Sequence, residues 1–392
     1  MTTFPLESFL GDLEFLINTD SGSADVEGNL QVASFFKERF EKAGLETVLH
    51  RVGTLRRPVV IAKTPGSASY DYFFSGHIDT VFPSGTVSER PFRREGNFVY
   101  GPGTVDMKAG ALLILYLAEY LRKEHPAFSF TIALNSDEEI GSPDSTPLLR
   151  EFAATCRHIF IFEGQRKQGQ FVNERKGIAK FDIEVSGVAS HAGTAPHQGV
   201  SAILELSKII VDFSKLQNLE RGTSINVGLM QGGSALNVIP AHASAKMELR
   251  YTSHREYERI LRAMSKMETK PHLSGASVTF TAISHYPPLE ITEATEQMMQ
   301  TLAPLGLSYV KAGGTSDANR LACLGLPILD GCGPGGGFPH SEKEFLDITT
   351  VPARFEQLIE IIKKLSLSPN YRKLSGSFFC LKFLFPEDFH AD

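Results

Sequence analysis

Residues of the types that bind divalent metal ions recur in five short segments of this 392-residue chain. The segments contain His77 with Asp79, Asp106, the adjacent pair Glu138 and Glu139, Glu163 and, far downstream, His340. Imidazole and carboxylate ligands together suit zinc, and they also accept cobalt or manganese. Each segment alone could be an ordinary solvated loop, but the five together indicate a hydrolase with two metal ions, although the ligand types also allow a single ion.

Hydrophobic runs lead into three of these polar tips. Residues 72–76, 128–134 and 158–162 are rich in aromatic and aliphatic side chains. Such runs are typical of buried strands that deliver ligands to one edge of a sheet. If the first strand extends past His77, Asp79 points the same way and can accept the second N–H of the imidazole.

The other segments complete the pattern. Asp106 ends a glycine-rich turn before the apolar stretch 111–121, which we predict to be a helix, so its carboxylate could bridge two cations. In an extended strand end the neighbouring side chains of Glu138 and Glu139 would diverge, so that one binds metal while the other accepts a proton. His340 follows a run of three glycines.

At these residues the chain resembles the zinc-dependent exopeptidases and deacylases that include aminoacylase, acetylornithine deacetylase, succinyl-diaminopimelate desuccinylase and the glutamate carboxypeptidases. The matching motifs are Gly76-His77-Ile78-Asp79-Thr80-Val81, Gly101-Pro102-Gly103-Thr104-Val105-Asp106-Met107-Lys108-Ala109-Gly110, Asp137-Glu138-Glu139-Ile140-Gly141-Ser142, Glu163, Pro339-His340-Ser341, Ala189-Ser190-His191-Ala192-Gly193 and Asn237-Val238-Ile239-Pro240. Together they cover most of the chain, which makes the resemblance specific.

The resemblance implies a role for each matching residue. It assigns one zinc ion to His77 and Glu163, a second to Glu139 and His340, Asp106 to both as the bridge, Glu138 as general base and Asp79 as the partner of His77. It also implies that His191, Asn237, Arg250 and the glycine loop of Gly313 and Gly314 bind substrate, with His191 reaching the active site of the other subunit to support the oxyanion. Two zinc ions per subunit and a homodimer are therefore expected.

The positions of the ligands also predict how the domains are organised. Ligands lie on both sides of a long insertion, so we expect a discontinuous catalytic domain, residues 1–176 and 288–392, around an inserted domain, residues 177–287. Within the insertion, the patterns predict strand 179–185, helix 201–213, strand 224–228, strand 245–251, helix 255–267 and strand 276–282, which is the ferredoxin-like order. The expected fold class is α/β: a mixed, mostly parallel sheet flanked by helices, as the resemblance implies, with an inserted α+β domain for dimerisation or as a lid.

The phrases 77–83, 248–251 and 313–318 are most similar to the glutamate carboxypeptidase branch. That branch releases a C-terminal amino acid, so the resemblance implies cleavage of an amide bond in a peptide or N-acyl amino acid, with glutamate as one candidate product. An N-acyl amino acid deacylase of the aminoacylase, acetylornithine deacetylase or desuccinylase type remains the alternative. A non-catalytic binding module of the same fold, or a bilobed ligand-binding protein without metal, is a further one.

One departure affects the specificity that the resemblance implies. The glutamate-cleaving branch has a lysine in the loop just after the position of Glu163. This chain has four basic residues there without a clear match in register: Arg166, Lys167, Arg175 and Lys176. The residue that meets a substrate side chain is therefore left open by the sequence.

Composition argues against several other classes of protein. Lys and Arg number 39 against 45 Asp and Glu, giving a net charge of −6 without a basic block, so nucleic acid is not an expected partner. Neither a signal peptide nor an apolar stretch of membrane-spanning length is recognisable, which predicts a cytoplasmic protein that does not associate with membranes.

Two other features complete the predictions from sequence. Four cysteines without metal or redox spacing are expected to be reduced: Cys156, Cys323, Cys332 and Cys380. After an expected last helix, 352–367, the tail 371–392 is rich in apolar residues, and we expect it to pack on the catalytic domain.

Overall fold

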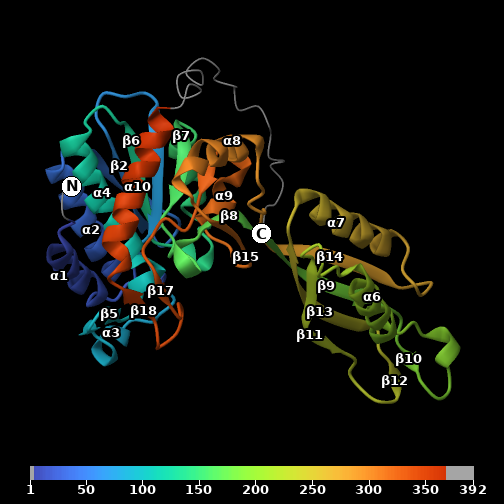
Figure 1. Ribbon diagram of the computed structural model, residues 1–392. Coiled ribbons are helices and arrows are strands. Elements are labelled where there is room, and N and C mark those ends of the chain that lie inside the picture. The colour runs from blue at the N-terminus through green and yellow to red at the C-terminus, as the bar shows by residue number, and fades with distance from the viewer. Residues whose placement is uncertain (1–3, 368–392) are drawn as a thin grey trace.

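The computed structural model describes residues 4–367, which form a larger and a smaller α/β unit (Figure 1). The larger unit contains both the first and the last described helices, α1 (Leu6–Ile17) and α10 (Thr350–Ser366), and the smaller unit contains α6 (Ala202–Leu216) and α7 (His254–Thr269). The apolar tail 371–392 and Cys380 lie outside the described residues. No helix of the described part is both long and apolar enough to cross a membrane.

A six-stranded mixed sheet forms the centre of the larger unit. Its strands, in spatial order, are β1 (Glu46–Val52), β2 (Arg57–Lys63), β6 (Phe130–Asn135), β3 (Tyr70–His77), β7 (Cys156–Ile161) and β16 (Ile328–Leu329). β6, β3, β7 and β16 pair in parallel, whereas β1 and β2 are antiparallel. This is the mixed, mostly parallel sheet expected from the sequence.

Helices cover both faces of this sheet because neighbouring strand residues point to opposite faces. Tyr72 and Phe74 pack into the main core, which includes buried residues of α1, α2 (Val26–Lys42), α4 (Ala109–Glu124), α8 (Glu293–Leu302) and α10. Phe73 belongs to a second core with α5 (Thr146–Ala153) and α9 (Asp317–Leu321). The predicted helix 111–121 is confirmed as the central part of α4.

Short elements frame the edge of the sheet where the polar tips lie. A four-stranded sheet contains β17 (Gly336–Gly337), β18 (Phe345–Asp347), β5 (Phe98–Tyr100) and β4 (Arg93–Glu95). Two parallel strands, β8 (Phe171–Arg175) and β15 (Tyr309–Ala312), lie near the β16 end of the central sheet, where Val172 pairs with Asp330, and α3 (Thr86–Glu89) is a single turn. These elements bring residues from both ends of the chain to one place.

The smaller unit is a four-stranded antiparallel sheet with two helices. Its elements follow the predicted order: β9 (Gly177–Ser186), α6 (Ala202–Leu216), β11 (Ser224–Gly232), β13 (His242–Tyr251), α7 (His254–Thr269) and β14 (Ser277–Tyr286). The strand order β11-β13-β9-β14 and the shared core of both helices are those of a ferredoxin-like fold. A short pair, β10 (Ser190–His191) with β12 (Val238–Ile239), was not expected.

One amide side chain holds both chain segments that connect the units. Asn319, which is fully buried in α9, donates hydrogen bonds to the carbonyl oxygens of Lys176, at 3.1 Å, and of Pro287, at 2.7 Å. Lys176 precedes β9 and Pro287 follows β14, so the entry to the smaller unit and the exit from it are joined through a single residue of the larger one.

Candidate metal centre

Three parallel neighbours of the central sheet deliver most of the predicted ligands. β3 ends at His77, β6 ends just before Glu138 and Glu139, and β7 ends just before Glu163. The carboxyl ends of parallel strands meet at one edge of a sheet, which is where open α/β folds place their sites. Asp106 joins them from the turn before α4.

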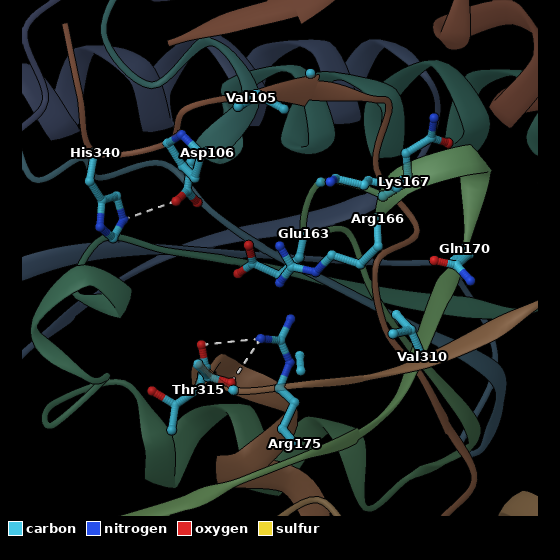
Figure 2. A pocket seen from close by; sticks show the side chains of 18 of the residues that line it. Val105, Asp106, Glu163, Arg166, Lys167, Gln170, Arg175, Val310, Thr315 and His340 are labelled. Carbon is cyan, nitrogen blue, oxygen red and sulfur yellow. Dashed lines mark hydrogen bonds and ion pairs between the residues drawn. The ribbon is translucent and has the colours of Figure 1, made fainter. Parts of the chain in front are cut away.

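The ligand-type side chains meet around the carboxylate of Asp106. Its Oδ1 lies 3.3 Å from Nε2 of His77, and its Oδ2 lies 3.0 Å from Nε2 of His340. Nε2 of His77 is also 3.7 Å from Oε1 of Glu163, and Nε2 of His340 is 3.1 Å from Oε2 of Glu139. Figure 2 shows Asp106 beside His340, with Glu163 facing the same space. The structure thus brings together all five predicted metal ligands.

Glu138 stands slightly apart in the same group. Its Oε2 is 3.9 Å from Nε2 of His77, the longest of the distances between His77 and the surrounding carboxylates. Its ligand-type atoms lie within 4.8 Å of those of His77 and Glu163, so it also stands close enough for proton transfer at a shared ligand. The same distances also place Glu138 in a candidate ligand group with His77 and Glu163, so the predicted division between ligands and base stays a prediction.

The donor set fits a pair of divalent cations. Nε2 of His77 and Oε1 of Glu139 are buried without a hydrogen-bond partner among the described residues, although unsatisfied buried polar atoms are rare. Burial and then the charge of Asp106 raise the pKa of Glu163 to about 8, and burial raises the pKa of Glu138 well above its usual range. Such a cluster of acids is costly unless cations or protons compensate it.

Asp79 does more than support the histidine. The backbone carbonyl oxygen of Asp79 lies 3.0 Å from Nδ1 of His77, whereas the carboxylate Oδ1 of Asp79 lies 3.4 Å from the same nitrogen. The carboxylate accepts the backbone N–H groups of Glu138 and Glu139, both at 3.2 Å, and the hydroxyl of Ser23 at 2.7 Å. Asp79 therefore fixes the turn that carries the two glutamates as well as the ring of His77.

The expected extended conformation of the two glutamates is wrong. Glu138–Ile140 forms a single 3-10 turn, because the Asp79 carboxylate accepts two consecutive N–H groups and curls the backbone around itself. β3 also ends at His77, so Asp79 lies beyond the strand. The two glutamates still separate: Glu139 pairs with His340, and Glu138 faces His77.

Sequence reasoning missed Glu344, which is 1% exposed. Its carboxylate accepts the backbone N–H groups of Gly103, Val105 and Asp106 at 3.1, 2.9 and 3.1 Å. Glu344 lies four residues after His340, so it links the His340 loop to the Asp106 turn. No sequence signal marks it, because it lies in a run of polar and charged residues that reads as an exposed loop.

Replacing Glu344 with glutamine should weaken metal binding by roughly 10- to 100-fold, because an NH₂ group would then face a backbone N–H that needs an acceptor. Competition with a chromogenic chelator measures this affinity, and circular dichroism reports whether the variant folds. Glu342→Gln, an exposed change two residues away, is the matched control. Equal zinc affinity in both variants would show that Glu344 does not position the site.

The predicted substrate residues divide into two sets. Gly313 and Gly314 line a pocket of about 600 Å³ that also contains Asp106, Glu138, Glu139, Glu163 and His340. Arg250 does not line this pocket, but its Nη1 donates to the carbonyl oxygen of Gly313 at 3.0 Å and its Nε pairs with Glu248 at 2.7 Å. Arg250 therefore touches the glycine loop from the smaller unit.

His191 and Asn237 do not reach the pocket of their own chain. Both are exposed, and they lie near the β10–β12 pair at the end of the smaller unit away from β17 and β18 (Figure 1). Nδ1 of His191 accepts the backbone N–H groups of Gly193 and Thr194, each at 3.1 Å. Their predicted role thus depends on a second subunit.

The three cysteines within residues 4–367 do not line the metal-site pocket. Cys156 and Cys332 are buried and Cys323 is exposed, and these three are unpaired in the described part of the chain. Burial raises the pKa of the Cys156 thiol to about 12, which makes it unreactive near neutral pH. These three agree with the reduced, structural cysteines expected from the sequence.

Comparison with known proteins identifies the family. The model of peptidase family M20/M25/M40 matches residues 73–366. Carboxypeptidase G2 of Pseudomonas sp. (strain RS-16) is 27% identical over 369 residues, which cover 90% of this chain and 88% of that protein.

Solved structures share the fold. Aminopeptidase PepT from Bacillus cereus superposes with a TM-score of 0.78 at 21% identity, covering 92% of this chain and 99% of its own. A dinuclear metal-binding M20 peptidase from Bacillus subtilis gives a TM-score of 0.65 at 15% identity, covering 91% and 97%. The family that the motifs predicted is confirmed: the chain belongs to peptidase family M20/M25/M40, a family of metallopeptidases.

Proposed function

We propose that this metallopeptidase is a di-zinc carboxypeptidase that cleaves an amide bond and releases a C-terminal amino acid, with glutamate as the leading candidate, from a peptide or N-acyl amino acid. The observation that carries the proposal is the position of Asp106, whose two carboxylate oxygens face His77 and His340 separately. The similarity to carboxypeptidase G2 over 90% of the chain supports the carboxypeptidase reaction.

We assign His77 and Glu163 to one zinc ion, Glu139 and His340 to a second, and Asp106 to both. Cobalt and manganese are compatible with the same ligands. A bound pair of cations supplies Lewis acidity toward water and toward the carbonyl of the scissile bond. The dinuclear metal-binding peptidase from B. subtilis, which shares the fold, supports a count of two.

The residues of the chain then handle the proton and the substrate. Glu138 takes a proton from the attacking water and delivers it to the leaving amine, as a free carboxylate beside that water can do. Asp79 keeps Glu138 in place by accepting its backbone N–H. The N–H groups of the Gly313–Gly314 loop bind a carboxylate of the substrate, and Arg250 supports this loop.

A homodimer completes the site in this proposal. His191 and Asn237 are exposed and remote from their own pocket, so we assign them to the pocket of a partner subunit, where His191 supports the oxyanion. β11 supports this arrangement because it is an edge strand of the smaller sheet with the exposed apolar side chains of Leu229 and Met230. Light scattering of the purified protein measures the mass and tests the dimer.

The proposal is tested by measuring the metal content of the purified protein together with the amino acids that it releases. The substrates are dipeptides, folyl-glutamate and N-acyl amino acids, with and without added zinc. About two metal ions per chain and preference for one C-terminal residue are expected. Faster cleavage of N-acetyl or N-succinyl amino acids would indicate a deacylase, and bound metal without hydrolysis of any of these compounds would contradict the proposed reaction.

A further inference from the structure

Two arginines line the metal-site pocket with N–H groups that have no acceptor. Nη2 of Arg175 and Nε of Arg166 are both buried, and neither makes a hydrogen bond within residues 4–367. Both side chains line the same pocket, and Figure 2 shows Arg166 beside Glu163 with Arg175 extending toward the same space. Unsatisfied N–H groups of a buried guanidinium are costly, so this pair indicates a place where a ligand binds.

Arg175 is held rigidly with its free nitrogen aimed into the pocket. The side chain is 3% exposed, its Nε pairs with the fully buried Asp330 at 2.5 Å, and its Nη1 donates to the carbonyl oxygens of Gly314 at 3.1 Å and Thr315 at 3.4 Å. These contacts engage Nε and Nη1 and fix the orientation of the planar guanidinium. The remaining nitrogen, Nη2, therefore points along a direction that the protein sets in advance.

Arg166 supplies the second donor from the loop that follows Glu163. It makes no ion pair with any described residue, whereas Asp330 offsets the charge of Arg175. Both guanidinium groups are positively charged and line the same pocket, so an anion that enters it is attracted to both. The geometry is that of a fork that accepts a carboxylate, which guanidinium groups bind through several charge-assisted hydrogen bonds.

We propose that Arg166 and Arg175 form an anion subsite that selects an acidic side chain on the substrate. The inference rests on the proposed peptidase function and adds the chemical class of residue that it recognises. Nη1 of Arg175 donates to the carbonyl oxygens of Gly314 and Thr315. The subsite therefore adjoins the glycine loop that we assign to the α-carboxylate of the substrate. A C-terminal residue with two carboxylates, such as glutamate, engages both places at once.

A pair of substrates that differ only in charge tests this subsite. N-benzoyl-glutamate and N-benzoyl-glutamine have the same shape, and a site with unpaired donors should discriminate strongly between them. We expect a ratio of kcat/KM in favour of glutamate of roughly 100 in the unaltered protein, and Arg166→Gln should lower this ratio about tenfold or more. Arg175→Lys keeps a cation beside Asp330 while removing the Nη2 donors, and it should lower the ratio in the same way without exposing an unpaired buried acid.

Lys167→Gln is the matched control, because Lys167 lines the same pocket, is exposed and follows Arg166 in the chain. If Lys167→Gln lowered the glutamate-to-glutamine ratio of kcat/KM as much as Arg166→Gln does, the preference would depend only on the overall positive charge of the pocket. That result would overturn the assigned subsite. A glutamate-to-glutamine ratio of kcat/KM near one in the unaltered protein would also overturn the subsite. If both compounds were hydrolysed, the carboxypeptidase proposal would still hold. Binding of free glutamate but not glutamine, measured by calorimetry, is the expected result independent of turnover.

Discussion

Replacing Glu138 with glutamine should reduce kcat by roughly 10²- to 10⁴-fold while the protein keeps its metal. Glutamine has nearly the same size and retains one oxygen, but it cannot take a proton from water or hand one to the leaving amine. The backbone N–H of residue 138 would still donate to Asp79, so the turn that carries Glu139 should be unchanged. The defect should therefore lie in the chemical step.

The measurement pairs steady-state kinetics with metal analysis of the same samples. Glu151→Gln, an exposed change in α5, serves as the control and should behave like the unaltered protein. Normal turnover in Glu138→Gln would move the role of base to another group. If Glu138→Gln lost one metal ion as well as turnover, Glu138 would be a metal ligand. Its distance of 3.9 Å from His77 also permits that role.

Asp106→Asn should have an effect at least as large, because one carboxylate faces both histidines. An amide offers one oxygen where the carboxylate offers two, and it carries no charge to balance two cations. We expect the variant to keep at most one metal ion per chain and to lose roughly 10³-fold or more in kcat/KM. The fold should persist, since within residues 4–367 the side chain of Asp106 forms ion pairs with these two histidines alone.

Chelator-treated unaltered protein is the matched reference for this variant. After treatment with dipicolinate, the unaltered protein should fall to the same residual activity and regain its rate when zinc is added back. Asp106→Asn should not recover at the same zinc concentration. Recovery of full activity in the variant, with two bound ions, would exclude Asp106 as the bridge.

The sequence predicted the metal group because that group depends on rules that a sequence displays. A hydrophobic strand followed by an acid or a histidine, repeated three times, places His77, Glu139 and Glu163 at one edge if the strands are parallel neighbours, as they are. The elements of the smaller unit were also predictable, since each alternates or repeats with its own period. The local hydrophobic pattern of the sequence was therefore enough to predict most of the strands and helices that position the site.

The missed features depend on contacts between distant segments. Glu344 meets the Asp106 turn across 238 positions, and Arg175, one of four basic candidates that the sequence did not distinguish, meets Asp330 across 155. The 3-10 turn at Glu138 likewise depends on Asp79, 59 residues earlier. The local pattern of one sequence does not show which distant residues make contact. The anion subsite and the contacts that position the metal ligands could therefore be recognised only in the three-dimensional structure.

The two hydrogen bonds from the Asn319 amide to the connecting segments have a thermodynamic consequence. Asn319 ends the stretch that begins with Gly313 and Gly314, and its side chain holds the carbonyl oxygens of Lys176 and Pro287. A change in the angle between the units that displaces Lys176 or Pro287 strains one of these bonds or shifts the stretch that lines the pocket. If a ligand binds this stretch more tightly at one angle between the units, the bound ligand stabilises that angle. The two effects are equal in free energy, because coupling between binding and conformation is reciprocal. Occupancy of the pocket and the arrangement of the two units are thus linked equilibria.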